Sequence, residues 1–172
     1  MGMDVIGIQP KTETGEYFRN NVWYWRPLAT FIQDVYPHLA EKCTYWGSND
    51  GDGLDAEDSA ILGKMILNDI KDGTVALWKA DYDYQLSLLE RTPCEHCGST
   101  GIRTDEVGLE QSMPTRELEE SVKILTGRTH GWCNGCRGVG TCENWSLSYP
   151  FDVENVERFA LFLIDCGGFQ IC

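Results

Sequence analysis

Cysteine is the residue type in this sequence with the clearest capacity for chemistry, and the chain contains eight of them. Four form two C-x-x-C pairs, Cys94 with Cys97 and Cys133 with Cys136, which are separated by residues 98–132. A tetrahedral zinc ion takes four ligands, and each C-x-x-C turn offers two thiolates from one short segment. Glycines that follow each pair let the backbone turn tightly. The pattern therefore predicts one structural Zn²⁺ per chain, bound by these four cysteines.

Two disulfide bonds, or a thiol redox pair of the C-x-x-C type, are the alternatives to this zinc site. Disulfides are typical of secreted chains, but Met1-Gly2-Met3 leads into an apolar segment without a basic and apolar leader. Cysteines in a reducing compartment and the doubled spacing both favour zinc. The sequence leaves open the roles of the other four: Cys43, Cys142, Cys166 and Cys172.

Both pairs resemble the C-x-x-C-x-G-x-G unit of the DnaJ-type cysteine-rich region. Residues 133–140 match this unit fully, and residues 94–101 match except that Ser99 replaces the first glycine. Four such units would bind two zinc ions, so the two units here imply one metal. The sequence has no His-Pro-Asp tripeptide, so a co-chaperone function has no support.

A second set of residues has the composition of a site for a flat, charged ligand. Tryptophan rings stack on bases, arginine offers a bidentate fork to phosphate, and Asn and Asp read polar edges. The alternative for the rings is ordinary packing in the core. We predict a ligand or partner site that contains Arg19, Trp23, Trp25, Arg26, Trp46, Asn49 and Asp50.

Residues 48–58 form an acidic loop whose carboxylates could bind calcium or magnesium. The EF-hand register fails, because Ser48 occupies the first position and Ser59 occupies the twelfth, where a bidentate Glu is required. We therefore expect a helix entry without a tight calcium site. Asp52 and Asp55 are expected to accept backbone N–H bonds at the start of the helix that follows.

No catalytic motif in the sequence supports an enzymatic function. The sequence has no Gly-x-Ser-x-Gly elbow, phosphate-binding loop or His-Glu-x-x-His motif. Four cysteine ligands would also close the coordination of the metal. These features favour a binding protein. The alternative is a metal-dependent enzyme that acts on a nucleotide or nucleic acid through Asp50 and Asp52.

The elements that must position these residues follow from hydrophobic periodicity and end signals. Helices are predicted over residues 27–36, 55–72, 75–91, 115–126 and 152–166, and strands over residues 3–8 and 169–172. We expect the two strands to pair and bring the termini together. Residues 17–26 show no clean periodicity. The sequence thus predicts an α+β, mainly helical fold: a single compact domain over residues 1–172, with a zinc-binding insertion over residues 94–142.

Length and charge limit the function further. The 172 residues are enough for one hydrophobic core, and 27 acidic against 14 basic residues give a net charge of −13. Broad binding to duplex nucleic acid needs a basic surface, so we do not expect this protein to bind duplex nucleic acid across a broad surface. The longest apolar run, residues 159–164, is too short to span a membrane. The oligomeric state is left open.

Several segments along the whole chain resemble a family of small proteins from bacteria and their phages. These segments are Met-Gly-Met-Asp-Val-Ile-Gly at 1–7, Phe-Arg-Asn-Asn-Val-Trp-Tyr-Trp-Arg-Pro-Leu at 18–28, and residues 48–54, 149–156 and 165–169. The resemblance implies a bacterial cytoplasm and a phage or prophage origin, and it brings no activity or catalytic residue. For a phage accessory protein, an anti-defence role fits this size and acidity. The expected partner is a small nucleotide-like ligand or a host protein.

Overall fold

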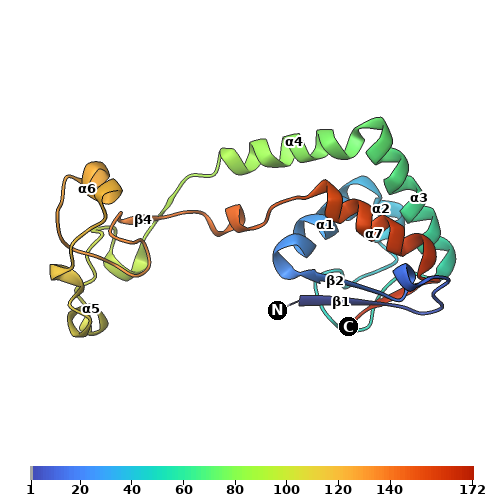
Figure 1. Cartoon of the computed structure of the whole chain (residues 1–172), viewed down its shortest axis with the longest axis horizontal. Coiled ribbons are helices and arrows are strands. Elements are labelled where there is room, and N and C mark those ends of the chain that lie inside the picture. The colour runs from blue at the N-terminus through green and yellow to red at the C-terminus, as the bar shows by residue number, and fades with distance from the viewer. Residues whose placement is uncertain (1) are drawn as a thin grey trace. The chain divides into compact units, whose positions relative to one another are not determined.

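The computed structural model describes residues 2–172, which form two compact units (Figure 1). Unit 1 contains residues 2–87 and 148–172, and unit 2 contains residues 88–147. The sequence placed a zinc-binding insertion over residues 94–142 of a single domain. The second unit extends beyond these bounds on both sides.

Unit 1 contains a three-stranded antiparallel sheet with the strand order β2-β1-β5. The strands are β1 (Gly2–Gly7), β2 (Tyr17–Asn21) and β5 (Phe169–Ile171). Val5 in the central strand pairs with Phe18 on one side and with Ile171 on the other. The predicted pairing of the N-terminal and C-terminal strands is therefore confirmed.

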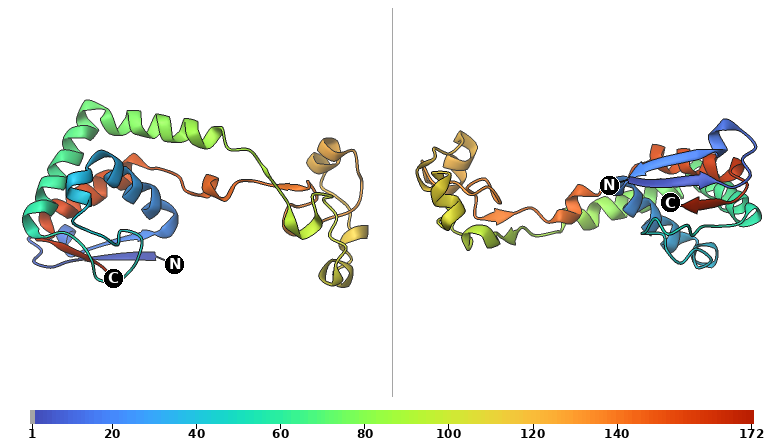
Figure 2. Two further views of the ribbon diagram at one scale, coloured as in Figure 1. Left: turned by 180° about the vertical axis from the view of Figure 1, so that it is seen from behind. Right: turned by 90° about the horizontal axis from the view of Figure 1, so that it is seen from below.

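Five helices belong to the same unit: α1 (Val22–Val35), α2 (Pro37–Ala40), α3 (Ala56–Asp72), α4 (Thr74–Ser87) and α7 (Val153–Asp165). Helices α1, α3 and α7 lie on the same side of the sheet (Figure 2). Together with the sheet, they confirm the predicted α+β, mainly helical fold. In the described residues, no helix is both long enough and apolar enough to cross a membrane.

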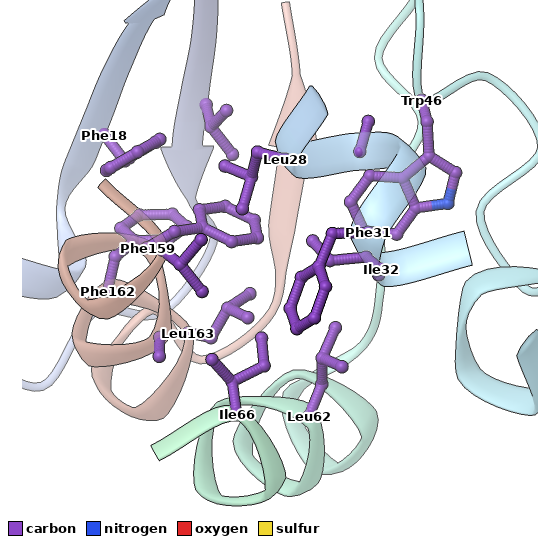
Figure 3. Packing of buried hydrophobic residues seen from close by; sticks show 14 of the residues in the cluster. Phe18, Leu28, Phe31, Ile32, Trp46, Leu62, Ile66, Phe159, Phe162 and Leu163 are labelled. Atoms are coloured by element: carbon purple, nitrogen blue, oxygen red, sulfur yellow. The ribbon is translucent and has the colours of Figure 1, made fainter. Parts of the chain in front are cut away.

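The core of unit 1 lies between the sheet and these helices (Figure 3). Phe159 of α7 packs against Phe18 of β2, with their ring centroids 5.0 Å apart, and Leu62 and Ile66 of α3 are fully buried. Each large apolar side chain buried in this way contributes about 1.5–3 kcal/mol to folding. Helix α7 therefore holds the edge strand β2 in place through its aromatic residues.

The N-terminal region of α1 differs from the sequence prediction. The helix begins at Val22 and not at Pro27, because the Asn21 Oδ1 atom accepts the N–H groups of Trp23 and Tyr24 at 3.0 and 3.1 Å. Pro27 lies inside the helix, where its ring removes one N–H donor. Asparagine capping, and not proline, sets where this helix starts.

The end signals of α3 act as predicted, whereas α4 is shorter than expected. The Asp55 carboxylate caps α3, and Gly73 ends it in the left-handed conformation with φ of 89°. Helix α4 ends at Ser87 and not at Arg91. The carboxylate of Asp55 and the backbone freedom of Gly73 therefore set the two ends of this helix.

Unit 2 has little regular structure. It contains β3 (Thr92–Pro93) paired with β4 (Thr141–Cys142), and the helices α5 (Glu106–Glu110) and α6 (Glu120–Thr126). The helix predicted over residues 115–126 is reduced to α6. Short 3₁₀ turns in the chain are η1 (Glu13–Gly15), η2 (Glu95–Cys97), η3 (Met113–Thr115) and η4 (Trp145–Ser148).

Candidate functional site

The four predicted ligands, Cys94, Cys97, Cys133 and Cys136, form one cluster in unit 2 that could hold a metal ion such as zinc. Their sulfur atoms all lie within 4.8 Å of one another, with Cys94 Sγ 3.8 Å from Cys133 Sγ and Cys97 Sγ 3.7 Å from Cys136 Sγ. Ligands bound tetrahedrally to zinc at about 2.3 Å lie about 3.8 Å apart. The same distances are far longer than the roughly 2.05 Å of a disulfide bond. The geometry fits a metal ion better than disulfide bonds.

Backbone N–H groups from the glycines after each pair point at the sulfur atoms. Gly101 N donates to Cys97 Sγ at 3.3 Å, and Gly140 N donates to Cys136 Sγ at 3.2 Å. Both glycines have positive φ angles, 76° and 95°, which L side chains rarely adopt. These donors would stabilise negative charge on thiolates that bind a cation.

Burial and hydrogen bonding act on the pKa values of these thiols in opposite directions. Burial raises the pKa of Cys94, whose side chain is 1% exposed. The pKa of Cys97 is lowered: burial opposes this shift, but the Gly101 N–H group and the neighbouring thiols outweigh it. Since a buried thiolate is costly without a cation, the cluster is suited to a metal that compensates its charge.

The two short strands and an arginine hold the two cysteine pairs together. Strand β3 ends directly before Cys94 and pairs with β4, and Cys94 N donates to Gly140 O at 3.0 Å. Arg103 forms an ion pair with Asp105 at 2.8 Å and donates to Asn134 Oδ1 at 2.8 Å. The Arg103 side chain thereby connects the segment between the two cysteine pairs to the second pair.

The remaining four cysteines are all free thiols. Cys142 lies beside the cluster, where its Sγ donates to Gly135 O at 3.4 Å. Cys43 and Cys166 are buried in unit 1, and Cys172 is exposed. Burial, followed by the charge of Asp52, raises the pKa of Cys43 to about 12. Cys43 is therefore a neutral core thiol at physiological pH.

The seven residues predicted to form a ligand site do not converge on one point. Trp25 and Trp46 are core residues, 1% and 2% exposed, and their rings stack with centroids 6.3 Å apart. Trp23 and Arg26 both contact Tyr149: the Trp23 ring lies 4.9 Å from the Tyr149 ring, and Arg26 Nη1 donates to its hydroxyl at 2.8 Å. The aromatic residues thus serve packing on two sides of α1.

The other three predicted residues lie elsewhere in unit 1. Asn49 donates to the carbonyl of Gly2 at 3.3 Å, and Asp50 is exposed. Arg19 lines a cavity with residues from α1 and α7. Of the predicted set, Arg19 is the residue that the fold places beside an open space.

The acidic loop serves the scaffold. Asp55 caps α3, as predicted. Asp52 does not bond at the start of that helix; its carboxylate accepts the N–H groups of Thr44, Tyr45 and Gly53 at 2.5, 2.9 and 2.8 Å. The Tyr45 N–H group, with those of Gly53 and Thr44, lowers the pKa of Asp52 against the opposing effect of burial. This carboxylate is therefore already committed to backbone donors.

A cavity of about 410 Å³ lies between the end of β2 and the first turns of α1 and α7. Its lining residues are Arg19, Asn20, Asn21, Tyr24, Asp152, Asn155 and Arg158. Sequence reasoning did not single out the α7 residues for a site. The polar positions Asp152, Asn155 and Arg158, set between the apolar residues of an amphipathic helix, are the only local signal for them.

Comparisons with known proteins found no relative of this chain. No protein-family model, no curated protein and no solved structure matches it.

Proposed function

We propose that this chain is a zinc-stabilised binding protein that captures a small nucleotide-like ligand. The observation that carries the zinc part of the proposal is the closed set of four cysteine sulfurs in unit 2, with separations that suit a tetrahedral ion. Four sulfur ligands leave no coordination position for water or substrate, so the metal has a structural role.

The zinc ion, when bound, supplies a cross-link between the two cysteine pairs. Residues 98–132 are enclosed by these pairs, and their regular structure is limited to the short helices α5 and α6 and the turn η3. Buried apolar side chains in this segment are few: Met113, Leu118 and Val122. A segment with so small a core gains much of its stability from a metal.

The alternative function, a metal-dependent enzyme that uses Asp50 and Asp52, has weaker support. A catalytic Mg²⁺ needs carboxylate oxygens that are free to coordinate it. Asp52 accepts three backbone N–H groups, and the bridge that it forms with Ile171 fixes the loop against β5. We therefore favour binding over catalysis.

The resemblance of the sequence to bacterial and phage proteins supports a more specific form of this proposal. The protein then acts in a bacterial cytoplasm as a phage accessory protein that counters a defence system. It does so by sequestering a nucleotide-like signal. Masking of a host protein is the second form of the same role, and the net charge of −13 suits it.

The metal assignment is tested by changing one predicted ligand. Cys136→Ser should lose the metal and destabilise unit 2 by several kcal/mol, because metal binding and folding are coupled at such a site. Native mass spectrometry should detect one zinc ion in the unchanged chain and none in the variant.

Cys142→Ser is the matched control, since Cys142 is the nearest free thiol outside the predicted ligand set. This variant should keep one zinc ion and its melting temperature. Retention of stoichiometric zinc by Cys136→Ser, or its loss from Cys142→Ser, would contradict the ligand assignment.

A further inference from the structure

We propose that the cavity bounded by Arg19, Asn20, Asn155 and Arg158 binds the phosphate-bearing ligand of this protein. The ligand has the size of a mononucleotide and presents an amino group beside a ring nitrogen. This inference rests on the proposed binding function and is independent of the zinc site. The volume of about 410 Å³ lies within the range of about 300–1,000 Å³ that small-molecule sites occupy.

Two arginines give this cavity positive charge in a strongly acidic chain. Among residues 2–172, Arg19 has one ion-pair partner, Asp4, with an Nε–Oδ1 distance of 3.8 Å, at the outer limit of an ion pair. Arg158 forms no ion pair within residues 2–172, and its guanidinium lies over the Phe18 ring, 5.6 Å from the centroid. Both side chains are exposed, so their guanidinium groups can turn toward a phosphate and bind it through paired N–H bonds.

Two helices begin at the same cavity. Asn21 is the N-cap of α1 and Asp152 is the N-cap of α7, and both residues line the cavity. These helices contain 14 and 13 residues, long enough for a full helix dipole at each end. Helix N-termini favour anions, and they add to the charge of the arginines.

A pair of buried asparagines favours a ligand with a polar edge. Asn20 and Asn155 are 5% and 6% exposed, and Asn20 Nδ2 donates to Asn155 Oδ1 at 3.0 Å. The amide oxygen of Asn20 and the amide nitrogen of Asn155 take no part in this bond, and neither atom is shut off from solvent. Since both residues line the cavity, this acceptor and this donor are available to a ligand that replaces water there.

The open donor and acceptor match the edge of an amino-substituted base. Adenine presents an amino group next to the N7 acceptor, and asparagine amides read this pair of atoms. Hypoxanthine has a carbonyl oxygen in place of the amino group, so it offers two acceptors and leaves the asparagine acceptor unpaired. The site should therefore discriminate between the two bases.

Asp152 sets the strength of anion binding. Its carboxylate lines the cavity and also caps α7, accepting the N–H group of Glu154 at 3.1 Å. A phosphate in the cavity would meet this negative charge. Asparagine is an equally good N-cap, so Asp152→Asn removes the repulsion and keeps the helix start.

The test is isothermal titration calorimetry of the zinc-loaded full chain with adenosine 5′-monophosphate at low ionic strength. Adenosine 5′-monophosphate should bind more tightly than inosine 5′-monophosphate, adenosine or inorganic phosphate. Arg158→Gln should weaken its binding roughly tenfold or more, because a charged hydrogen-bond donor is lost. Asp152→Asn should strengthen its binding.

Lys64→Gln is the matched control, because Lys64 is exposed on α3, is not among the residues that line the cavity, and its loss changes the net charge by the same amount. It should leave the affinity unchanged. Absence of binding at millimolar nucleotide, or an equal loss from Lys64→Gln and Arg158→Gln, would overturn the proposal. If the protein binds the nucleotide tightly and neither Arg158→Gln nor Asp152→Asn changes the affinity, the ligand does not bind in this cavity. The proposed binding function would then remain intact.

Discussion

Asn20 occupies a position in β2 where strand alternation would ordinarily place an apolar side chain. Phe18 and Asn20 face inward, while Tyr17, Arg19 and Asn21 are exposed. The buried amide is tolerated because Asn155 of α7 bonds to it, and losing that partner would leave an unsatisfied polar group that costs about 1–3 kcal/mol. One polar residue thus connects the edge strand to the helix that covers it.

Ser99 has a backbone conformation that is unusual for its residue type. Its φ angle of 66° places it in the left-handed region, at the position where the second knuckle has Gly138 with φ of 93°. An L residue other than Asn or Asp is disfavoured there by roughly 1 kcal/mol. The serine is therefore held in a strained conformation by the knuckle around it.

Ser99→Gly should stabilise unit 2, because glycine adopts this conformation without the steric cost of a Cβ atom. The expected gain is about 0.5–1 kcal/mol in the free energy of unfolding, measured by thermal denaturation of the zinc-loaded protein. Arg137→Gly, with φ of 53°, should shift the melting temperature in the same direction. Thr100→Gly should lower it, because Thr100 Oγ1 donates to Cys97 O. A lower melting temperature for Ser99→Gly would contradict the assignment of strain.

Packing of α3 against α7 is the largest contact between helices in unit 1. It depends on Gly63, where an added Cβ would lie 2.7 Å from the carbonyl oxygen of Ala160 and 3.1 Å from the Cβ atom of Leu163. The helices approach so closely because Gly63 has no side chain, which leaves room for the Ile164 side chain of α7. Glycine is otherwise unfavourable inside a helix by about 1 kcal/mol relative to alanine, so close approach explains its use here.

Gly63→Ala should destabilise the protein even though it raises the helix propensity of α3. Overpacking of a tight contact costs about 1–3 kcal/mol, which exceeds the gain in propensity of about 1 kcal/mol. Urea denaturation followed by circular dichroism measures the difference. Gly47→Ala is the control, since a Cβ atom at Gly47 meets nothing within 4 Å, and its effect should be close to zero. An increase in stability for Gly63→Ala would show that the helices separate without cost.

At the scale of the whole molecule, the chain has two compact units with different sources of stability. Unit 1 has a core of aromatic and aliphatic residues from its sheet and helices. Unit 2 has a cluster of buried cysteines and few other buried apolar residues. Hydrophobic burial supports the first unit, and we infer that the metal supports the second.

Removal of the metal with a chelator should therefore unfold unit 2 and leave unit 1 folded. Hydrogen–deuterium exchange followed by mass spectrometry should show faster exchange over residues 88–147, with little change in β1, α3 and α7. Addition of zinc should restore the original exchange pattern. Equal loss of protection in both units would instead mean that the metal supports the fold as a whole.

Features that depend on neighbouring residues could be predicted from the sequence. The two cysteine pairs are local, since each C-x-x-C turn fixes its own two sulfur atoms, and the ends of α3 follow from the caps Asp55 and Gly73. The start of α1 differs from the prediction, because Pro27 is a typical first-turn residue but Asn21 supplies the cap. The sequence does not predict strand β2, because buried Asn20 interrupts the alternation of apolar and polar residues.

Only the tertiary structure decided which polar residues share a cavity. Arg19 and Asn20 come from the edge strand, whereas Asn155 and Arg158 come from a helix near the other end of the chain. Packing of Phe18 against Phe159 brings these segments together, and no local pattern in either segment records that contact. Trp25 and Trp46 show the converse, because their aromatic character suits a ligand site equally well but the fold buries both in the core. Residue type and spacing determined the metal ligands, while long-range packing determined the pocket.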